Sequence, residues 1–250
     1  LDLIPSLITS HNFLPKISLL QSFSGLFSKS SCIWVKSSSA CSFEPIIGSN
    51  DESTLTNTEN KAIAKNITNF KNSVKANGGY YIARYEASYG TDGKANSKVS
   101  NTYGYSTPNK EGQLWNRITQ IDAATASRNL YNTVNSDLIN SYAWDTATLF
   151  LQTCGTNSKY SRQTKVSSAL SQTGTNTQST KDVQCNVYDM ASNTREWTTE
   201  TYDNSDIPCV KRGGSYNGSI SYTSNRFNNN PSNSYDSIGF RPLLFVGLNS

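Results

Sequence analysis

Histidine, methionine and charged residues are scarce in this chain. Its 250 residues include one His and one Met, and only 16% are charged. With His11 as the single histidine, the sequence argues against a histidine-ligated metal site and against a histidine general base. The net charge of +4 is spread thinly and Lys and Arg form no block, so we expect no nucleic-acid partner. No apolar run reaches the roughly 18 residues of a membrane span, so we expect none in this chain.

Cysteine pairs of the C-x-x-C type are also absent, which argues against a zinc site. The five cysteines are Cys32, Cys41, Cys154, Cys185 and Cys209. The first residue is Leu and the only methionine is Met190, so we expect a processed product or a fragment of a longer chain.

Aromatic residues and small polar residues are abundant. The 14 Tyr, 9 Phe and 4 Trp supply core material, which excludes a disordered chain. Asn, Ser, Thr and Tyr carry the polarity in place of Lys and Glu. Predicted helices come first and short irregular strands follow, which indicates an α+β fold rather than a parallel sheet.

Two regions differ in pattern. Residues 1–52 are Ser-rich with no sustained period, and we interpret them as a poorly ordered leader or the remnant of an upstream region. A hydrophobic membrane leader around residues 17–27 is the weaker alternative, because Ser and Gln interrupt it. Residues 53–250 form the predicted domain.

Three helices and an early strand are predicted in this domain. The helices span residues 54–77, 119–131 and a short stretch around 144–151, and the strand spans 80–86. Capping pairs mark the first two helix starts, namely Thr56 with Glu59 and Thr119 with Asp122. The inward faces are expected to carry Ile63, Ile67, Phe70 and Val74, then Ile121, Ala124 and Leu130, then Trp144, Ala147 and Leu151.

Six segments in order carry a resemblance to a known family. They are GYYIARYEA (79–87), the Trp-led stretch 115–130, YAWDTA (142–147), NVYDMASNTREW (186–197), RGGSY (212–216) and GFRP (239–242). Together they resemble the formylglycine-generating-enzyme, or sulfatase-modifying-factor, family across about residues 79–245. The string NVYDMASNTREW is the most specific of them.

The resemblance implies a C-type-lectin-like α+β fold, rich in loops, with a small antiparallel sheet and two or three helices. In that fold Trp197 and Phe240 would be core aromatics that fix the loops.

Active members of the family oxidise a cysteine with two cysteines and a copper ion. The matching positions here are Gly218 and Thr223, and residues 213–250 contain no cysteine. Neither residue forms a thiolate, so we expect no copper and no catalysis.

The resemblance also implies a calcium site in the turn of the NVYDMASNTREW segment. Its ligands would be the side chains of Asp189 and Glu196 and the carbonyls of Ser192 and Thr194, which suit a hard cation. The alternative is that Asp189 and Glu196 cap the turn by accepting hydrogen bonds from backbone amides.

The family's strand order, by the same resemblance, places Cys185 beside Cys209. An exported protein would form a disulfide there, and two buried thiols are the alternative.

Asn, Ser, Tyr and Gly dominate residues 215–236. Small amides mixed with aromatics are typical of adaptable binding surfaces such as antibody loops. In this fold, the region resembles the hypervariable face of retroelement-diversified proteins, although the bias of an AT-rich genome also explains frequent Asn. The candidate ligand-binding residues are Tyr216, Asn217, Ser219, Tyr222, Asn225, Asn228, Asn229, Asn230, Asn233 and Tyr235.

Three functions remain open from the sequence. The first is a non-catalytic domain that binds a protein or glycan on a bacterial or phage surface, which places it outside the cell or on a virion. The second is a divergent oxidoreductase of the formylglycine-generating type. The third is a purely structural domain of a surface or pilin-like protein.

Overall fold

The computed structural model describes most of the predicted domain. It describes residues 32–36 by their backbone, and 67–90, 94–96, 112–131, 135–170, 182–202, 204 and 206–245. All described elements belong to one compact unit. Apart from residues 32–36, the predicted leader lies outside the described residues, as does the first part of the first predicted helix with its cap pair Thr56 and Glu59.

Helices form at the predicted places. They are α2 (Ile67–Asn77), α3 (Gln120–Arg128), α4 (Ser141–Cys154) and the 3-10 turn η1 (Tyr160–Arg162). The hydroxyl of Thr119 accepts the amide N–H of Asp122, so the predicted cap of α3 is confirmed. Helix α4 is longer than expected, begins at an Asn140 side-chain cap, and buries Trp144 and Leu151. None of these helices is long and apolar enough to cross a membrane, among the residues described.

The buried face of α3 differs from the prediction. Ala124 is buried as expected, but Ile121 is 37% exposed. The buried positions are mostly small residues, namely Ala123, Ala124, Ala126 and Ser127. Because these side chains are short, the helix lies close to its sheet, and Gln120 Nε2 donates to the Thr198 carbonyl at 3.0 Å. The larger Ile121 therefore falls outside the contact.

The first four-stranded sheet is antiparallel throughout. Its order is β1 (Cys32–Lys36), β2 (Gly79–Ala83), β12 (Pro242–Phe245) and β5 (Asn135–Leu138). Strand β1 is an edge strand, and its register runs from Cys32 opposite Ala83 to Lys36 opposite Gly79. This strand lies inside the segment that the sequence analysis interpreted as a leader.

The second four-stranded sheet is mixed. Its order is β10 (Arg226–Asn229), β9 (Cys209–Arg212), β8 (Arg195–Thr201) and β11 (Ile238–Phe240), and β11 runs parallel to β8. Two short ladders complete the strands, β3 (Ser88–Tyr89) with β4 (Ala95–Asn96) and β6 (Val183–Gln184) with β7 (Val187–Tyr188). The expected small antiparallel sheet is thus two sheets, joined where β11 runs into β12 through Arg241.

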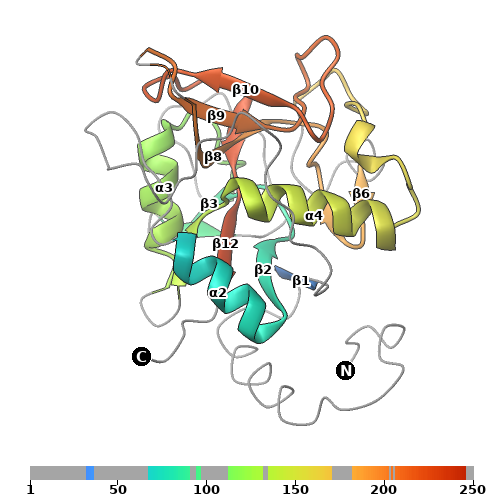
Figure 1. The fold of residues 1–250 in the computed structure, drawn as a ribbon. Coiled ribbons are helices and arrows are strands. Elements are labelled where there is room, and N and C mark those ends of the chain that lie inside the picture. Colours follow the sequence, from blue (N-terminus) through green and yellow to red (C-terminus); the bar gives the residue numbers. More distant parts are fainter. Residues whose placement is uncertain are drawn as a thin grey trace. The chain divides into compact units, whose positions relative to one another are not determined.

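Helix α4 lies between the two large sheets (Figure 1). One core cluster joins α4 to the first sheet, with Trp144 and Leu151 packed together with Ile82 and Leu243. A second cluster forms under α3 and β8, and it contains Trp197 and Phe240, both fully buried. These two aromatics are core residues, as expected.

Candidate functional site

The Arg-Gly-Gly motif places the loop after β9 against the turn of residues 189–194. Gly213 has a φ of +80°, a conformation that glycine adopts without strain. A side chain at Gly213 or Gly214 would overlap the carbonyl oxygen of Met190 or Ala191, respectively. Both glycines are therefore required by the close approach of two backbone segments.

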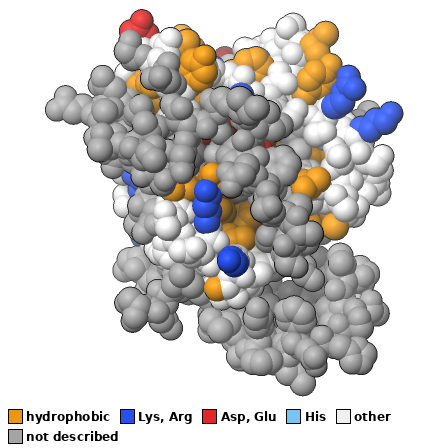
Figure 2. All heavy atoms as spheres, viewed as in Figure 1, with side chains coloured by type: hydrophobic (Ala, Val, Ile, Leu, Met, Phe, Trp, Pro, Cys, Tyr) orange, Lys and Arg blue, Asp and Glu red, His pale blue; other side chains and the backbone are white. Residues whose placement is uncertain are grey.

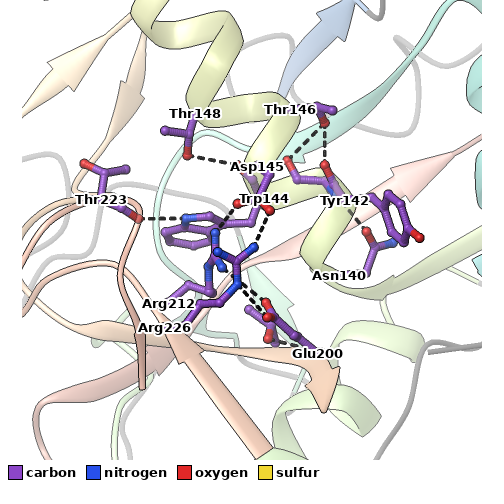
Figure 3. Close-up of polar contacts among 12 residues, drawn as sticks. Asn140, Tyr142, Trp144, Asp145, Thr146, Thr148, Glu200, Arg212, Thr223 and Arg226 are labelled. Carbon is purple, nitrogen blue, oxygen red and sulfur yellow. Dashed lines mark hydrogen bonds and ion pairs between the residues drawn. The ribbon is translucent and has the colours of Figure 1, made fainter. Parts of the chain in front are cut away.

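A balanced group of buried charges fixes β9 and β10 to α4 (Figure 3). Arg212 and Arg226 lie opposite each other on the two strands. Arg226 Nε donates to Glu200 Oε1 at 2.7 Å, and Arg212 Nη1 lies 3.3 Å from Glu200 Oε2. Both guanidinium groups also pair with Asp145 of α4. Two cations and two carboxylates neutralise one another, as buried ion pairs require.

Trp144 of α4 holds the base of the loop. Its indole Nε1 donates to the Thr223 carbonyl at 2.9 Å, as Figure 3 shows. The Arg212 guanidinium lies 5.9 Å from the centre of the indole ring. The loop between β9 and β10 is thus anchored at Thr223, and the residues exposed before that point are Asn217, Ser219 and Ile220.

The positions where the resemblance places copper-binding cysteines do not fit copper. Thr223 is fully buried and offers a hydroxyl instead of a thiolate. A Cβ atom at Gly218 would lie 2.8 Å from Ser221 Oγ and 2.9 Å from Arg195 Nη2. A cysteine at position 218 would therefore crowd both groups.

The structure places most of the candidate ligand-binding residues at the surface. Tyr235 is 54% exposed, and Ile220 in the loop after β9, which the sequence analysis did not select, is 69% exposed. The exposed candidates are Asn217, Ser219, Asn230 and Tyr235, and the partly exposed ones are Tyr216, Tyr222, Asn225, Asn228 and Asn233. On the face drawn in Figure 2, the described surface carries several basic side chains and few acidic ones.

Asn229 does not belong among the candidate ligand-binding residues. It is only 9% exposed, and its Oδ1 atom accepts the Asn230 backbone N–H and the Asn233 side-chain amide. Its side chain closes the turn after β10, because a short amide bonds readily to nearby backbone. Asn229 is therefore a structural residue.

The candidate residues form two groups. The Tyr216 hydroxyl donates to Asp236 Oδ2 at 3.0 Å, which joins the loop after β9 to the loop before β11. Tyr222 lies elsewhere, in a backbone bridge with Thr164 and with the Arg162 guanidinium 5.9 Å from its ring centre. The structure therefore brings Tyr216 close to the Tyr235 loop and places Tyr222 beside residues 162–164.

Arg195 lies between the two loops that Tyr216 joins, and the sequence analysis did not select it. Its Nη2 atom donates to Ser221 Oγ at 3.1 Å, and its guanidinium carbon lies 4.3 Å from the centre of the Phe227 ring. Its backbone N–H donates to the Ser237 carbonyl at 2.9 Å. The partners are 26 or more residues away in sequence, so only its place in the NVYDMASNTREW segment could have drawn attention to it.

Among the predicted calcium ligands, the carboxylate of Glu196 is engaged by a protein cation. Both carboxylate oxygens of Glu196 bond to Arg241, at 2.7 Å for the shortest contact, and both residues are fully buried. The Thr194 N–H and hydroxyl donate to Glu86, and Ser192 Oγ accepts the Val166 N–H. Glu196 therefore does not fit as a calcium ligand, because Arg241 supplies its positive charge. Calcium held by Asp189 and the carbonyls of Ser192 and Thr194 stays a proposal.

Buried carboxylates outnumber cations around Arg241. Burial and the neighbouring Glu196 raise the pKa of Glu86 to about 8. Burial also raises the pKa of Asp182, which accepts hydrogen bonds from Tyr160 and from the Ala191 amide. Among the described residues, no group of three or more His, Cys, Asp and Glu side chains is arranged to hold a metal.

The predicted disulfide does not form in this structure. Cys185 and Cys209 are free thiols, and they pack against different core clusters. Cys185 lies instead near Cys154, and burial together with that neighbour raises its pKa. The family's strand order misled the prediction, because Cys185 sits in the β6–β7 turn and not on a strand beside β9.

Comparison with solved structures finds similar architectures at low identity. "Crystal Structure of CarF" has a TM-score of 0.48 at 15% identity and covers 67% of this chain and 87% of that one. PvdO from Pseudomonas aeruginosa has a TM-score of 0.46 at 14% identity, with 68% and 81% covered. Treponema denticola variable protein 1 has a TM-score of 0.43 at 15% identity, with 67% and 85% covered. No curated protein matches the chain significantly.

A family model identifies the chain more directly. The model of the sulfatase-modifying factor enzyme 1-like domain matches residues 120–244. That range contains α3, α4, the second sheet and the Arg-Gly-Gly loop, which are the elements that build the surface described above. The chain therefore belongs to the family of sulfatase-modifying factor enzyme 1-like domains.

Proposed function

We propose that this domain is a non-catalytic binding module that recognises a protein or glycan through the loops of residues 213–225 and 230–237. One observation carries the proposal. The two positions that hold copper in active members are Gly218 and a buried Thr223, while the loops around them present exposed Tyr and Asn side chains. A site that has lost its thiolates but keeps its supporting framework is suited to recognition.

The framework supports this use because it is rigid where the loops are anchored. The Arg212–Asp145–Arg226–Glu200 group and the Trp144–Thr223 hydrogen bond hold the ends of the loop. Tyr side chains on such a scaffold supply contact area at low entropic cost, and Asn and Ser supply adaptable hydrogen bonds. We place the module outside the cell, on a cell surface or virion, where such recognition would occur.

Loop variants test the proposal against panels of immobilised glycans and purified surface proteins. We expect the wild type to bind a defined ligand, and Tyr235→Ala and Asn217→Ala to weaken that binding by about tenfold or more, as for residues at the centre of an interface. Lys75→Ala, on the exposed end of α2, is the matched control and should bind like the wild type. Unchanged affinity in both loop variants, or no binding to any panel member, would favour the purely structural role.

A further inference from the structure

Two basic side chains share one face of the second sheet. Lys211 lies directly opposite Trp197 on β8 and Phe227 on β10. Arg195 and Trp197 are two residues apart on β8, so their side chains point to the same face. Arg195 lies 4.3 Å from the Phe227 ring centre, and Lys211 Nζ lies 6.0 Å from the Trp197 ring centre. Both cations thus border the same pair of aromatic rings.

The opposite face of this sheet is charge-balanced, and this face is not. Arg212 and Arg226 each pair with Asp145 and Glu200 (Figure 3). Arg195 and Lys211, in contrast, form no ion pair with any residue that the structure describes. The Nε atom of Arg195 is buried and has no hydrogen-bond partner in the described part of the chain.

Unpaired cations that are half-buried are costly, because burial removes water without supplying a carboxylate. Burial lowers the pKa of Arg195. Burial and the nearby Arg195 lower the pKa of Lys211 to about 8. Proteins rarely keep such groups without a counter-charge, so the missing partner is expected to come from a bound anion.

The space around Arg195 suits an anion. Within the described part of the chain, the side chain of Arg195 makes one hydrogen bond, to Ser221 Oγ at 3.1 Å. A Cβ atom at Gly218 would come within 2.9 Å of Arg195 Nη2, so Gly218 packs closely beside the guanidinium. The Ser221 hydroxyl accepts from Arg195 and can donate its own hydrogen, so it adds a second donor beside the guanidinium. A guanidinium with a hydroxyl beside it matches the oxygens of a carboxylate, sulfate or phosphate.

We propose that Arg195, Lys211 and Ser221 bind an oxyanion group of the ligand, beside the Phe227 ring and Gly218. This inference rests on the proposed binding function, and it names the chemical class of what is bound. The exposed Tyr and Asn residues of the two loops then surround the anion and supply specificity.

Anion titration of the purified chain tests the inference without a known ligand. Sodium acetate, sulfate and phosphate are added separately at constant ionic strength, with sodium chloride as the reference salt. The Arg195 side-chain Nε–H and the amides of residues 218–221 are followed by NMR. We expect at least one of the three anions to give a saturable shift of these signals, and the strongest of them identifies the oxyanion.

Lys211→Met and Arg195→Met should each weaken that binding by about tenfold, the loss expected for one charge-assisted contact. Lys75→Met carries the same charge change at the exposed end of α2 and should leave it unchanged. If Arg195→Met does not fold, judged by circular dichroism, Lys211→Met alone decides the result.

Shifts that rise linearly with every salt, or equal affinities in Lys211→Met and Lys75→Met, would overturn the oxyanion site. The broader function fails separately. A macromolecular ligand whose binding depends on Tyr235 but not on Lys211 would remove this inference and leave the binding role in place.

Discussion

At the residue scale, the structure separates side chains that build the loops from those that are exposed at the surface. Asn229 and Asn217 look alike in the sequence, yet Asn229 closes the turn after β10 and Asn217 is exposed. Asn229→Ala should lower the free energy of unfolding by about 1–2 kcal/mol, since it removes the acceptor of two part-buried hydrogen bonds. Asn217→Ala should change it by about 0.5 kcal/mol or less. Urea unfolding of both variants measures the difference, and equal stabilities would contradict the assignment.

Asp145 is the residue on which the buried charge group depends. It accepts from both Arg212 and Arg226, and Arg212 has no exposed surface. Asp145→Asn should destabilise the domain by about 3–5 kcal/mol, because it leaves a buried cation without its partner. The exposed Asp206→Asn serves as the control for removing one negative charge. A stable Asp145→Asn variant would show that Glu200 alone balances both guanidinium groups.

Lys211 should make stability depend on alkaline pH. Its pKa is about 8 in the folded chain and 10.5 as the reference for an unfolded one, so between these values the unfolded chain binds more protons. Below this window the charged Lys211 destabilises the folded chain by a constant amount. Within the window this cost is relieved, so the free energy of unfolding rises with pH. Lys211→Met should remove that rise, and Lys75→Met should not. Parallel pH profiles for the wild type and Lys211→Met, measured by urea unfolding, would contradict a depressed Lys211 pKa.

At the scale of elements, strand β1 changes what is expected of the N-terminal region. The sequence analysis interpreted residues 1–52 as a poorly ordered leader or the remnant of an upstream region, but residues 32–36 pair with β2 along their whole length. A chain that begins at residue 53 should melt at a lower temperature than one that begins at residue 30, because β2 loses its edge partner. Equal melting temperatures would show that β1 contributes no stability and that the whole segment is a leader.

The sequence predicted elements best where local patterns decide them. The cap at Thr119 and the buried Trp144 and Leu151 of α4 follow from neighbouring residues and were correct. The sequence predictions failed where packing between distant residues decides which side chains are buried or paired. Ile121 is exposed because alanines set the contact of α3, and Glu196 pairs with Arg241, 45 residues away. No local pattern encodes either outcome.

The same limit applies to the candidate binding surface. Composition pointed to the loops of residues 213–237 as the candidate binding surface, because Tyr and Asn gather there in the sequence. Arg195 and Lys211 were missed because they lie on strands whose neighbours become known only from the sheet register. Asn229 was misassigned for a related reason. In a sequence rich in Asn, an exposed Asn cannot be told from one whose side chain bonds within a turn.

At the scale of the whole molecule, calcium would act through the folded state. If Asp189 and the carbonyls of Ser192 and Thr194 hold the ion, calcium should raise the melting temperature above that in chelator, by mass action. Asp189→Ala should abolish the difference. Identical melting curves of the wild type in calcium and in chelator would show that hydrogen bonds and the Arg241 ion pair alone hold this turn.

The central claim is that this family member recognises a ligand and performs no oxidation. The most direct measurement is incubation of the purified chain with copper, oxygen and a cysteine-containing peptide, with mass spectrometry of the peptide and an active family member as the positive control. The account predicts no conversion of cysteine to formylglycine, because Gly218 and Thr223 supply no thiolate and Arg195 and Ser221 occupy the space beside position 218. Copper-dependent conversion of the peptide by the wild type would contradict it.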